Sequence, residues 1–423
     1  MSDAVIPNIA ERSRGIPSPY EEALTWLFKT QRFGIKLGLE NSRRLFNALD
    51  VPQPNERIIH VAGTNGKGSV CALLDSICRA AGYRTALFTS PHLVSFRERI
   101  QVNGELISEG EVVRGLTKIR ELVAGWEPHP TFFEIATGLA LDHFRNLETE
   151  IVVLETGMGG RLDATNATQP VVSVLTPTDY DHQKWLGSSL TEIAREKAGI
   201  IKPGVPVVSA RQLPEVEAVI RARAAECAAP LDFVRQPLER LPVALSGTHQ
   251  KQNAALALSA LHTAKIEVND NAIARGLATV VWLARFQRWD ERTIIDGAHN
   301  PAGARTLAET WRENFGDQQA TVVLAVLQEK DVSGICAALG PIARRWLLPT
   351  IRSTRALAPE ELRLTIQDQF PDVPVAVMRS FPTAWAEARR DAANILVTGS
   401  LHFAGEALAF LQGKPAAFEE CLQ

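Results

Sequence analysis

The residues with the clearest chemical potential lie at positions 61–69, which read Val-Ala-Gly-Thr-Asn-Gly-Lys-Gly-Ser. An apolar run at 58–61 precedes them, and apolar residues at helical spacing follow at 70–78. A buried strand, a glycine-rich turn with a lysine and then a helix form a setting in which backbone N–H groups bind a phosphate. We therefore predict a phosphate-binding loop, with a plain connecting turn as the alternative.

This loop departs from the standard Walker A pattern, which starts with a Gly and has Ser or Thr directly after its Lys. Here Val61 and Gly68 stand at those two positions, and Ser69 follows one residue later. The motif therefore leaves open which hydroxyl would face a metal ion.

Polar residues also stand at the ends of three other apolar runs. Ser90 follows one run, Glu155 ends another, and His182 comes shortly after a third. In parallel sheets, ligands bind beyond the carboxyl ends of the strands, so these side chains are expected near the phosphate. A hydroxyl, a carboxylate and an imidazole could together hold Mg²⁺. The alternatives are a helix N-cap for Glu155 and a hydrogen-bonded core histidine for His182.

Three further segments could present charge to a ligand. The glycine-rich run at 157–160 allows close backbone approach, and Arg161 and Asp163 follow it. Its alternative is a flexible loop with a capping Asp. The segment 195–200 by itself favours a solvated charged turn ending in a glycine cap. The turn 296–301 presents Asp, His and Asn after a predicted strand, with an ordinary turn and N-cap as the alternative.

These segments are connected by alternating strands and helices. Apolar strands separated by helices predict a parallel sheet covered on both faces. The alternation restarts near residue 293, after the polar run 287–292. We predict an α/β protein: a P-loop-type, mostly parallel domain at 1–288, then a smaller Rossmann-like α/β domain at 289–423.

Composition limits the partners. The chain has 423 residues, 45% hydrophobic, and a formal net charge of −3, so no overall field attracts nucleic acid or an acidic membrane. Its cysteines are scattered without a CxxC motif, which favours reduced thiols. We find neither a secretory signal pattern nor an apolar run of the ~20 residues that a membrane span needs, and we expect a cytoplasmic protein.

Taken in order, the motifs resemble the folylpolyglutamate synthase/dihydrofolate synthase family, a branch of the Mur ligase superfamily of ATP-dependent acid–amino acid ligases. The segments that carry the resemblance are 63–69, Thr-Ser-Pro-His-Leu at 89–93, Thr-Phe-Phe-Glu at 131–134, 154–166, Asp-His at 181–182, Trp-Leu-Gly at 185–187, 195–200 and 296–301. The family usually has Pro-Gly where this chain has Leu283-Ala284, and more often Asp-Lys-Asp where it has Glu329-Lys330-Asp331.

The resemblance implies a set of ligand contacts. It implies ATP binding by Gly63, Thr64, Asn65, Gly66, Lys67, Gly68, Ser69, Asn253, Arg285 and Asp296. It implies Mg²⁺ ligation by Ser90, Glu155, His182 and a carbamylated Lys197, which replaces the solvated-turn interpretation of 195–200. It implies substrate contacts from the loop 33–40 and from Thr131, Phe132, Phe133, Glu134, Arg161, Asp163, His299 and Ser400. Lys67, Lys197 and His299 would be the catalytic residues.

The implied reaction joins L-glutamate to the carboxylate of dihydropteroate, of a folate, or of both, through an acyl phosphate. The main hypothesis is a bifunctional enzyme that acts as a monomer on small molecules and binds neither nucleic acid nor membranes. The first alternative is a folylpolyglutamate synthase without dihydrofolate synthase activity. The second is a P-loop switch or kinase, which would leave the second α/β domain unexplained.

Overall fold

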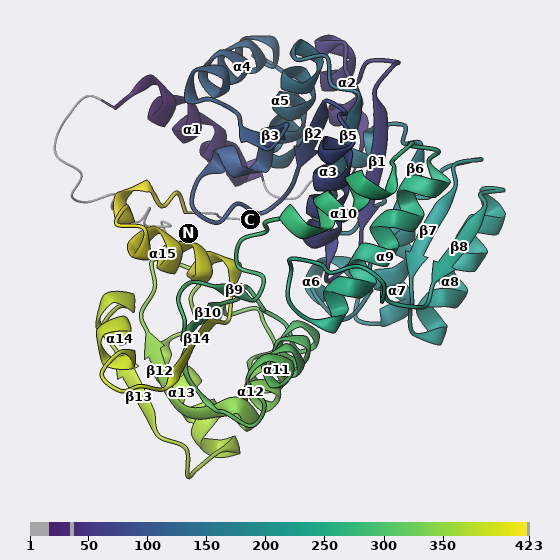
Figure 1. The fold of residues 1–423 in the computed structure, drawn as a ribbon. Coiled ribbons are helices and arrows are strands. Elements are labelled where there is room, and N and C mark those ends of the chain that lie inside the picture. The colour runs from purple at the N-terminus through teal and green to yellow at the C-terminus, as the bar shows by residue number, and fades with distance from the viewer. Residues whose placement is uncertain (1–16, 34–37, 421–423) are drawn as a thin grey trace.

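The computed structural model describes residues 17–33 and 38–420, and it contains two β-sheets, each covered by helices (Figure 1). The larger sheet and its helices form one body, and the smaller sheet forms a second body beside it. Both sheets are mostly parallel. The predicted fold class is therefore confirmed.

The first sheet has the strand order β4-β3-β2-β5-β1-β6-β7-β8. Its strands are β1 (Arg57–Ala62), β2 (Thr85–Phe88), β3 (Ile100–Val102), β4 (Glu105–Leu106), β5 (Ile151–Glu155), β6 (Val172–Leu175), β7 (Val207–Ala210) and β8 (Leu231–Val234). Strands β2, β5, β1 and β6 are neighbours, so their carboxyl ends lie along one edge of the sheet. The antiparallel pair β3–β4 turns at Asn103-Gly104, where both residues have positive φ, as the hairpin motif predicts.

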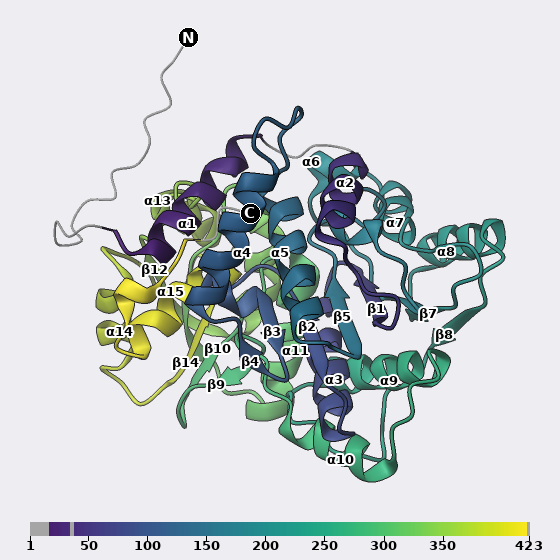
Figure 2. The ribbon, with the colours of Figure 1, turned by 90° about the horizontal axis from the view of Figure 1, so that it is seen from above.

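Helices cover both faces of this sheet. Successive strand residues point to opposite faces, so Val152 packs on one core and Val153 on the other. Figure 2 shows α2, α4 and α5 on one side of the strands and α3, α9 and α10 on the other. The helices are α1 (Pro19–Lys29), α2 (Glu40–Leu49), α3 (Lys67–Ala80), α4 (Glu109–Leu122), α5 (Phe132–Asn146), α6 (Gln183–Leu186), α7 (Leu190–Ala198), α8 (Pro214–Glu226), α9 (Thr248–Thr263) and α10 (Asp270–Thr279).

The second sheet has the order β13-β12-β11-β14-β10-β9 and is parallel except for β9. Its strands are β9 (Gln287–Arg288), β10 (Thr293–Ile295), β11 (Ala320–Leu324), β12 (Ala343–Pro349), β13 (Val375–Met378) and β14 (Asn394–Thr398). Its helices are α11 (Pro301–Phe315), α12 (Val332–Leu339), α13 (Pro359–Gln369), α14 (Phe381–Ala388) and α15 (Leu401–Leu411). Short 3₁₀ turns occur at Thr30–Phe33, Phe96–Arg99, Ala164–Ala167, Gly340–Ile342 and Pro415–Ala417.

The pattern analysis missed parts of the fold. Strand β8 lies at the edge of its sheet and its side chains are partly exposed, so it lacks the continuous apolar run of a central strand. Helix α8 was not predicted either. The helices of the region 236–290 are α9 and α10, which is less helix than predicted, and the region also contains β9. No helix among the described residues is long and apolar enough to cross a bilayer.

The connection between the two sheets contains the unusual Leu283-Ala284 pair. Ala284 is buried and has φ 53°, the left-handed conformation that favours glycine. Ala284 therefore adopts this conformation at a cost of about 1–2 kcal/mol, because it has a Cβ. Arg285 Nη1 donates to the Ala284 carbonyl at 2.9 Å, and its side chain lies against Gly297.

The second domain also contacts the loop that carries Ser90. Helix α15 approaches this loop so closely at Gly405 that a Cβ there would overlap the Leu93 carbonyl. The Glu419 N–H donates to the Val94 carbonyl at 2.8 Å, and the Glu419 carbonyl lies 3.0 Å from His92 Nε2. The position of the loop at the end of β2 thus depends on both domains.

Candidate active site

The phosphate-binding loop connects β1 to α3, as the sequence predicts. The Thr64 N–H donates to the Pro177 carbonyl at 2.9 Å, and the Thr64 hydroxyl donates to the Asp179 carbonyl at 2.9 Å. Gly63 and Gly66 have φ values of 150° and 89°, which a side chain would disfavour. The loop is therefore held in a fixed shape by the segment that follows β6.

The hydroxyl of Ser69 lies inside the fold and is not directed at the loop's open side. Ser69 is 1% exposed, and its Oγ accepts a hydrogen bond from Gln250 Nε2 at 3.3 Å. On the same helix α9, Asn253 lies directly against Gly66. Because its oxygen is already engaged, Ser69 is a poor candidate for a metal ligand in this loop.

A buried carboxylate stands beside this loop at the end of β5. Glu155 is 4% exposed, and its Oε2 accepts a hydrogen bond from the Ser90 N–H at 3.2 Å. Among the described residues, no ion pair within 4.0 Å involves Glu155. Burial raises the pKa of the Glu155 carboxyl above its usual value, and the Lys67 charge opposes that rise.

Lys197, at the end of α7, reaches the same edge of the sheet. It is 4% exposed, and its Nζ donates to the Gly63 carbonyl at 2.8 Å. Burial, reinforced by the Lys67 charge, lowers the pKa of Lys197 to about 7. The solvated-turn interpretation of this segment is therefore wrong for Lys197, because its ammonium group would be buried without an ion pair among the described residues.

Two glycines bring the glycine-rich loop into contact with the end of α7. A Cβ at Gly160 would lie 2.9 Å from the backbone oxygens of Glu196 and Lys197. A Cβ at Gly199 would lie 2.5 Å from the Arg161 Cα. Such backbone-to-backbone approach is available only without side chains, and it places the Lys197 backbone against residues 157–161.

Replacing Gly160 by Ala should therefore displace the end of α7 and move Lys197. We expect kcat to fall by about 100-fold, because a shift of about 1 Å at a reacting centre has that order of effect. Steady-state kinetics would measure it. The matched control is Gly110→Ala, where the nearest atom to the added Cβ is Arg114 Nη1 at 3.6 Å. Equal activity of the two variants would contradict the packing argument.

Arg161 and Asp163 are both engaged within the first domain. Arg161 Nη2 lies 2.8 Å from the Glu196 carboxylate, on the surface. Asp163 is buried, and its Oδ2 accepts from the N–H groups of Gly157 and Met158 at 2.8 and 3.0 Å. Its Oδ1 accepts from the N–H and hydroxyl of Thr165. Asp163 therefore shapes the glycine-rich loop, as the capping alternative predicts.

The segment 131–134, predicted to contact the substrate, stands at the start of α5. Glu134 Oε2 accepts from the Thr131 N–H and hydroxyl, and Glu134 Oε1 accepts from the Ser42 hydroxyl. These groups form a helix cap, so their polar atoms are already paired. Phe133 is half-buried and lies against Gly157, while Phe132 is buried. Residues 34–37 of the predicted loop 33–40 lie outside the described residues.

The second domain presents its own predicted residues at the end of β10. Asp296 Oδ2 accepts from the Phe286 N–H at 2.7 Å, and Oδ1 accepts from the Ala298 N–H at 2.8 Å. His299 Nδ1 lies 2.9 Å from the Gly297 carbonyl, so this nitrogen is the donor. Ser400 is buried and caps α15 by accepting from the Phe403 N–H at 3.0 Å.

The two domains meet at a junction formed by the segment after β6 and the loops after β10 and β11. The motifs assigned no role to three residues of this junction: Asp181, Asn300 and Lys330. Asp181 lies between β6 and α6, and its carboxylate contacts the other two across the junction. Although burial alone would raise it, contact with His299 holds the pKa of the Asp181 carboxyl well below its usual range. The only sequence signal for Asp181 is its position beside His182, since its partners are more than a hundred residues away.

The residues present at the strand ends fit a divalent metal. The His182 side chain is 42% exposed and its Nε2 lies 3.9 Å from the Asp181 carboxylate, so it is not a core histidine, and its imidazole in the neutral form can ligate a metal. The Thr156 hydroxyl, next to Glu155, is buried and has no hydrogen-bond partner among the described residues. However, no group of three or more His, Cys, Asp or Glu side chains suited to a metal occurs in the described chain. The site thus supplies Glu155 and His182, and further anionic oxygens would have to come from elsewhere.

Comparisons with known proteins show which proteins this chain resembles. A family model described as "Mur ligase, glutamate ligase domain" matches residues 284–401. The dihydrofolate synthase/folylpolyglutamate synthase of Bacillus subtilis is 34% identical over 422 residues, covering 91% of this chain and 97% of the relative. The Escherichia coli protein of the same name is 33% identical, covering 93% of this chain and 96% of the relative.

Solved structures match over nearly the whole chain. Escherichia coli FolC in complex with DHPP and ADP has a TM-score of 0.84 and 32% identity, and the match covers 94% of this chain and 99% of that one. The Yersinia pestis bifunctional folylpolyglutamate synthase/dihydrofolate synthase, complexed with AMPPNP and Mn ion, has a TM-score of 0.85 at 32% identity, covering 93% of this chain and 98% of that one.

The fold and the matched domain define this protein as a Mur ligase-type, ATP-dependent ligase. Within that class, the chain belongs to the dihydrofolate synthase/folylpolyglutamate synthase family.

Proposed function

We propose that this protein joins L-glutamate to the carboxylate of dihydropteroate and of reduced folates, with conversion of ATP to ADP and phosphate. The observation that carries the proposal is the gathering of Lys67, Glu155 and Lys197 at one edge of the first sheet, opposite Asp296 and His299 of the second domain. The names of relatives that align over nearly their full length supply the substrate class. The division into residues 1–288 and 289–423 and a monomeric state stay predictions.

The first step activates the pterin acid. A carboxylate oxygen attacks the terminal phosphorus of ATP, the bond to the bridging oxygen of ADP breaks, and an acyl phosphate forms. The amides of residues 64–68 and the Lys67 ammonium would hold the phosphates in line for this transfer. Asn253, which lies against Gly66, and Arg285, which lies beside Gly297, would contact the nucleotide from α9 and from the connection between the two sheets.

The second step forms the amide bond. The amine of L-glutamate attacks the acyl carbon, phosphate leaves, and the amine nitrogen loses a proton. His299 and Ser400 stand on the second domain where the incoming amino acid would be received, so closure of the domains orients amine and acyl phosphate. The half-buried Phe133 would contact the pterin, while Thr131 and Glu134 support it through the helix cap.

A divalent cation would be held by Ser90, Glu155 and His182. When bound, Mg²⁺ neutralises charge that develops on the transferring phosphoryl group. As a charged ammonium group, Lys197 cannot join this set, because it would repel the metal cation. Its carbamate, formed when the neutral amine adds CO₂ and releases a proton, would offer two anionic oxygens. Support for the carbamate comes from the burial of Lys197 and from the shortage of other anionic side chains.

The direct test follows ADP release with Mg-ATP and L-glutamate, with dihydropteroate in one arm and tetrahydrofolate in the other. Stimulation in both arms is expected. Stimulation by tetrahydrofolate alone would indicate a folylpolyglutamate synthase without dihydrofolate synthase activity. ADP release that is independent of glutamate in both arms would overturn the ligase assignment for this chain.

A further inference from the structure

The junction between the two domains is organised around one buried carboxylate. Asp181 belongs to the first domain, and its side chain is 8% exposed. Its Oδ1 accepts from Lys330 Nζ at 2.6 Å, and its Oδ2 lies 3.4 Å from His299 Nε2 and accepts from Asn300 Nδ2 at 3.2 Å. All three of these partners belong to the second domain, on the loops that follow β10 and β11.

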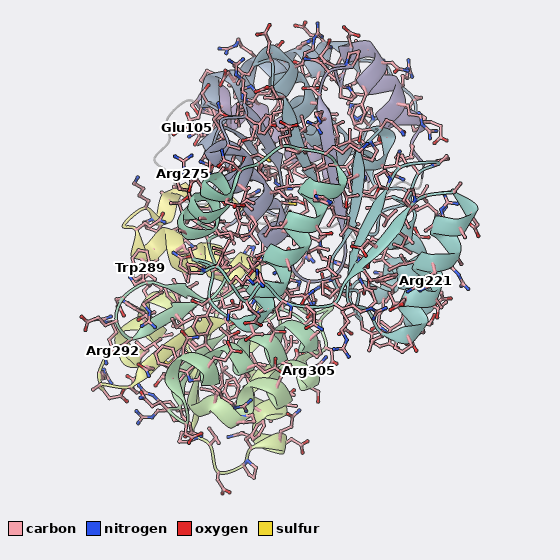
Figure 3. All side chains as sticks on the ribbon, turned by 45° about the vertical axis from the view of Figure 1, so that its right-hand side comes forward. Glu105, Arg221, Arg275, Trp289, Arg292 and Arg305 are labelled. Carbon is pink, nitrogen blue, oxygen red and sulfur yellow. The ribbon has the colours of Figure 1, made fainter. Side chains whose placement is uncertain are left out.

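The same cluster touches the phosphate-binding loop directly. The side-chain amides of Asn300 and Asn65 face each other, with Asn300 Nδ2 donating to Asn65 Oδ1 at 3.1 Å. Asn300 Oδ1 also caps α11 by accepting from the Gly303 N–H at 2.8 Å. Arg305 of α11 also approaches Asp179, two residues before Asp181, with its Nη2 3.7 Å from Asp179 Oδ2, near the junction in Figure 3. The contacts therefore join the end of β6, the loop after β1 and the start of α11.

We propose that Asp181 is a positioning residue: it holds Lys330 and His299 of the second domain over the phosphate-binding loop of the first. The proposal rests on the proposed function, because the amine acceptor and the acyl phosphate would be carried by different domains. Domains joined by a single connection move relative to one another by default. A buried ion pair across the junction favours one relative orientation, and a small error in that orientation slows a bimolecular step strongly.

The alternative role for Asp181, as a metal ligand next to His182, fits the contacts less well. Lys330 Nζ at 2.6 Å is itself a cation in direct contact with Oδ1, and its side chain is only 10% exposed. A metal ion on the same oxygens would have to displace that ammonium group or sit against it. The observed partners thus indicate that Asp181 binds the second domain.

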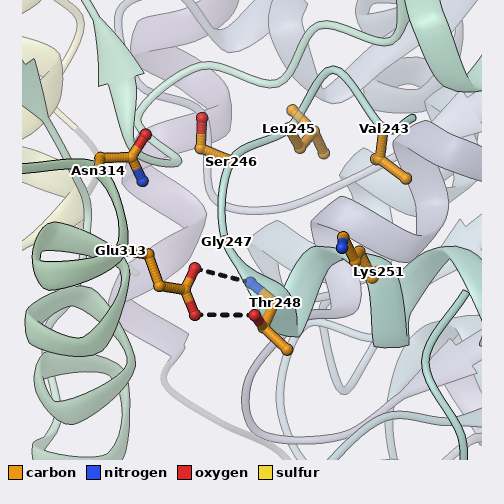
Figure 4. A pocket seen from close by; sticks show the side chains of 8 residues that line it. All are labelled: Val243, Leu245, Ser246, Gly247, Thr248, Lys251, Glu313 and Asn314. Carbon is orange, nitrogen blue, oxygen red and sulfur yellow. Dashed lines mark hydrogen bonds between the residues drawn. The ribbon is translucent and has the colours of Figure 1, made fainter. Parts of the chain in front are cut away.

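A second interdomain contact supplies a control. Glu313 of α11 accepts from the Thr248 N–H at 3.2 Å and from the Thr248 hydroxyl at 2.8 Å, at the start of α9 (Figure 4). Thr248 is exposed, and in the described part of the chain no hydrogen bond or ion pair joins either residue to the phosphate-binding loop. Glu313→Gln therefore alters a contact between the domains without touching the Asp181 cluster, and we expect less than about a threefold effect on turnover.

The test is a double-mutant cycle across the junction in the full-length protein, with Asp181→Asn, Lys330→Met and the double variant. Each single variant should lower kcat for glutamate-dependent ADP release by about 30-fold or more, and the double variant should be no slower than the slower single. The KM for ATP should change less than about threefold, since the loop amides and Lys67 remain. Lys330→Arg should recover at least about tenfold over Lys330→Met, because it keeps the charge.

The outcomes separate this inference from the proposed function. If the wild-type protein is active and the losses of the two single variants multiply in the double variant, the positioning role of Asp181 is overturned and the function stands. A fall in kcat for Glu313→Gln as large as that for Asp181→Asn would also overturn the positioning role. Disturbing any contact between the domains would then be enough to slow turnover. A wild-type protein without glutamate-dependent turnover counts against the function itself.

Discussion

A Lys197→Ala variant is expected to lose glutamate-dependent ADP release by about a thousandfold or more, because several kcal/mol of charge stabilisation depend on the metal site that its carbamate would complete. Lys197 is buried, and its amine contacts the Gly63 carbonyl. Steady-state ADP release with saturating substrates measures the loss. Partial recovery on addition of a small carboxylic acid, which could occupy the space left by the side chain, would identify the missing group as an anion.

Lys202 provides the matched control for this prediction. It lies just after α7, and its Nζ donates to the Asn166 carbonyl at 2.7 Å. Lys202→Ala should keep turnover within about fivefold, since a single hydrogen bond outside the site is lost. The carbamate itself can be observed by ¹³C NMR after incubation with labelled bicarbonate, as a signal present in the wild type and missing from Lys197→Ala. Full activity of Lys197→Ala would exclude any role for the carbamate.

A Glu155→Gln variant is expected to have opposite effects on activity and on stability. The amide has the shape of the carboxylate but carries no charge, so kcat should fall by about a thousandfold as metal binding weakens. In the metal-free protein, the variant removes a buried charge whose hydrogen bond comes from Ser90. We therefore expect its free energy of unfolding to rise by about 1 kcal/mol, as often happens when a functional site is neutralised. Urea denaturation at neutral pH measures this change.

Asp163 gives the contrasting case for the stability measurement. It is also a buried carboxylate, but its oxygens accept hydrogen bonds from Gly157, Met158 and Thr165. Asp163→Asn should lower the free energy of unfolding by about 1–3 kcal/mol, because an amide nitrogen cannot accept those bonds. A destabilised Glu155→Gln variant would show that Glu155 is a structural residue like Asp163.

The residues of the site differ in how far the sequence could place them. Glu155 ends an apolar strand, and Lys67 begins a helix after a strand and a glycine-rich turn, so the spacing of apolar residues and glycines alone puts both at the carboxyl edge of a parallel sheet. The role of Lys197 could not be obtained that way, because the segment 195–200 has the composition of an exposed turn. Its burial follows from the close approach allowed by Gly160 and Gly199, which belong to different segments.

Asp163 and Thr131 show a second limit. Their residue types suit both ligand binding and helix capping, and the sequence left both possibilities for Asp163. In the structure, their side-chain oxygens accept hydrogen bonds from nearby backbone N–H groups. These hydrogen bonds limit the capacity of each side chain to bind a substrate.

The phosphate-binding loop was determined by the sequence itself, because a strand, a glycine-rich turn and a helix form from residues that are neighbours along the chain. The fold class follows for the same reason, from the spacing of apolar residues. The junction was decided only by tertiary structure. Asp181, Lys330 and Asn300 meet because two separately formed domains pack against each other, and local periodicity carries no information about contacts between residues so distant in the chain. Burial then strengthens these contacts, since a charge removed from water needs a partner wherever in the chain that partner lies.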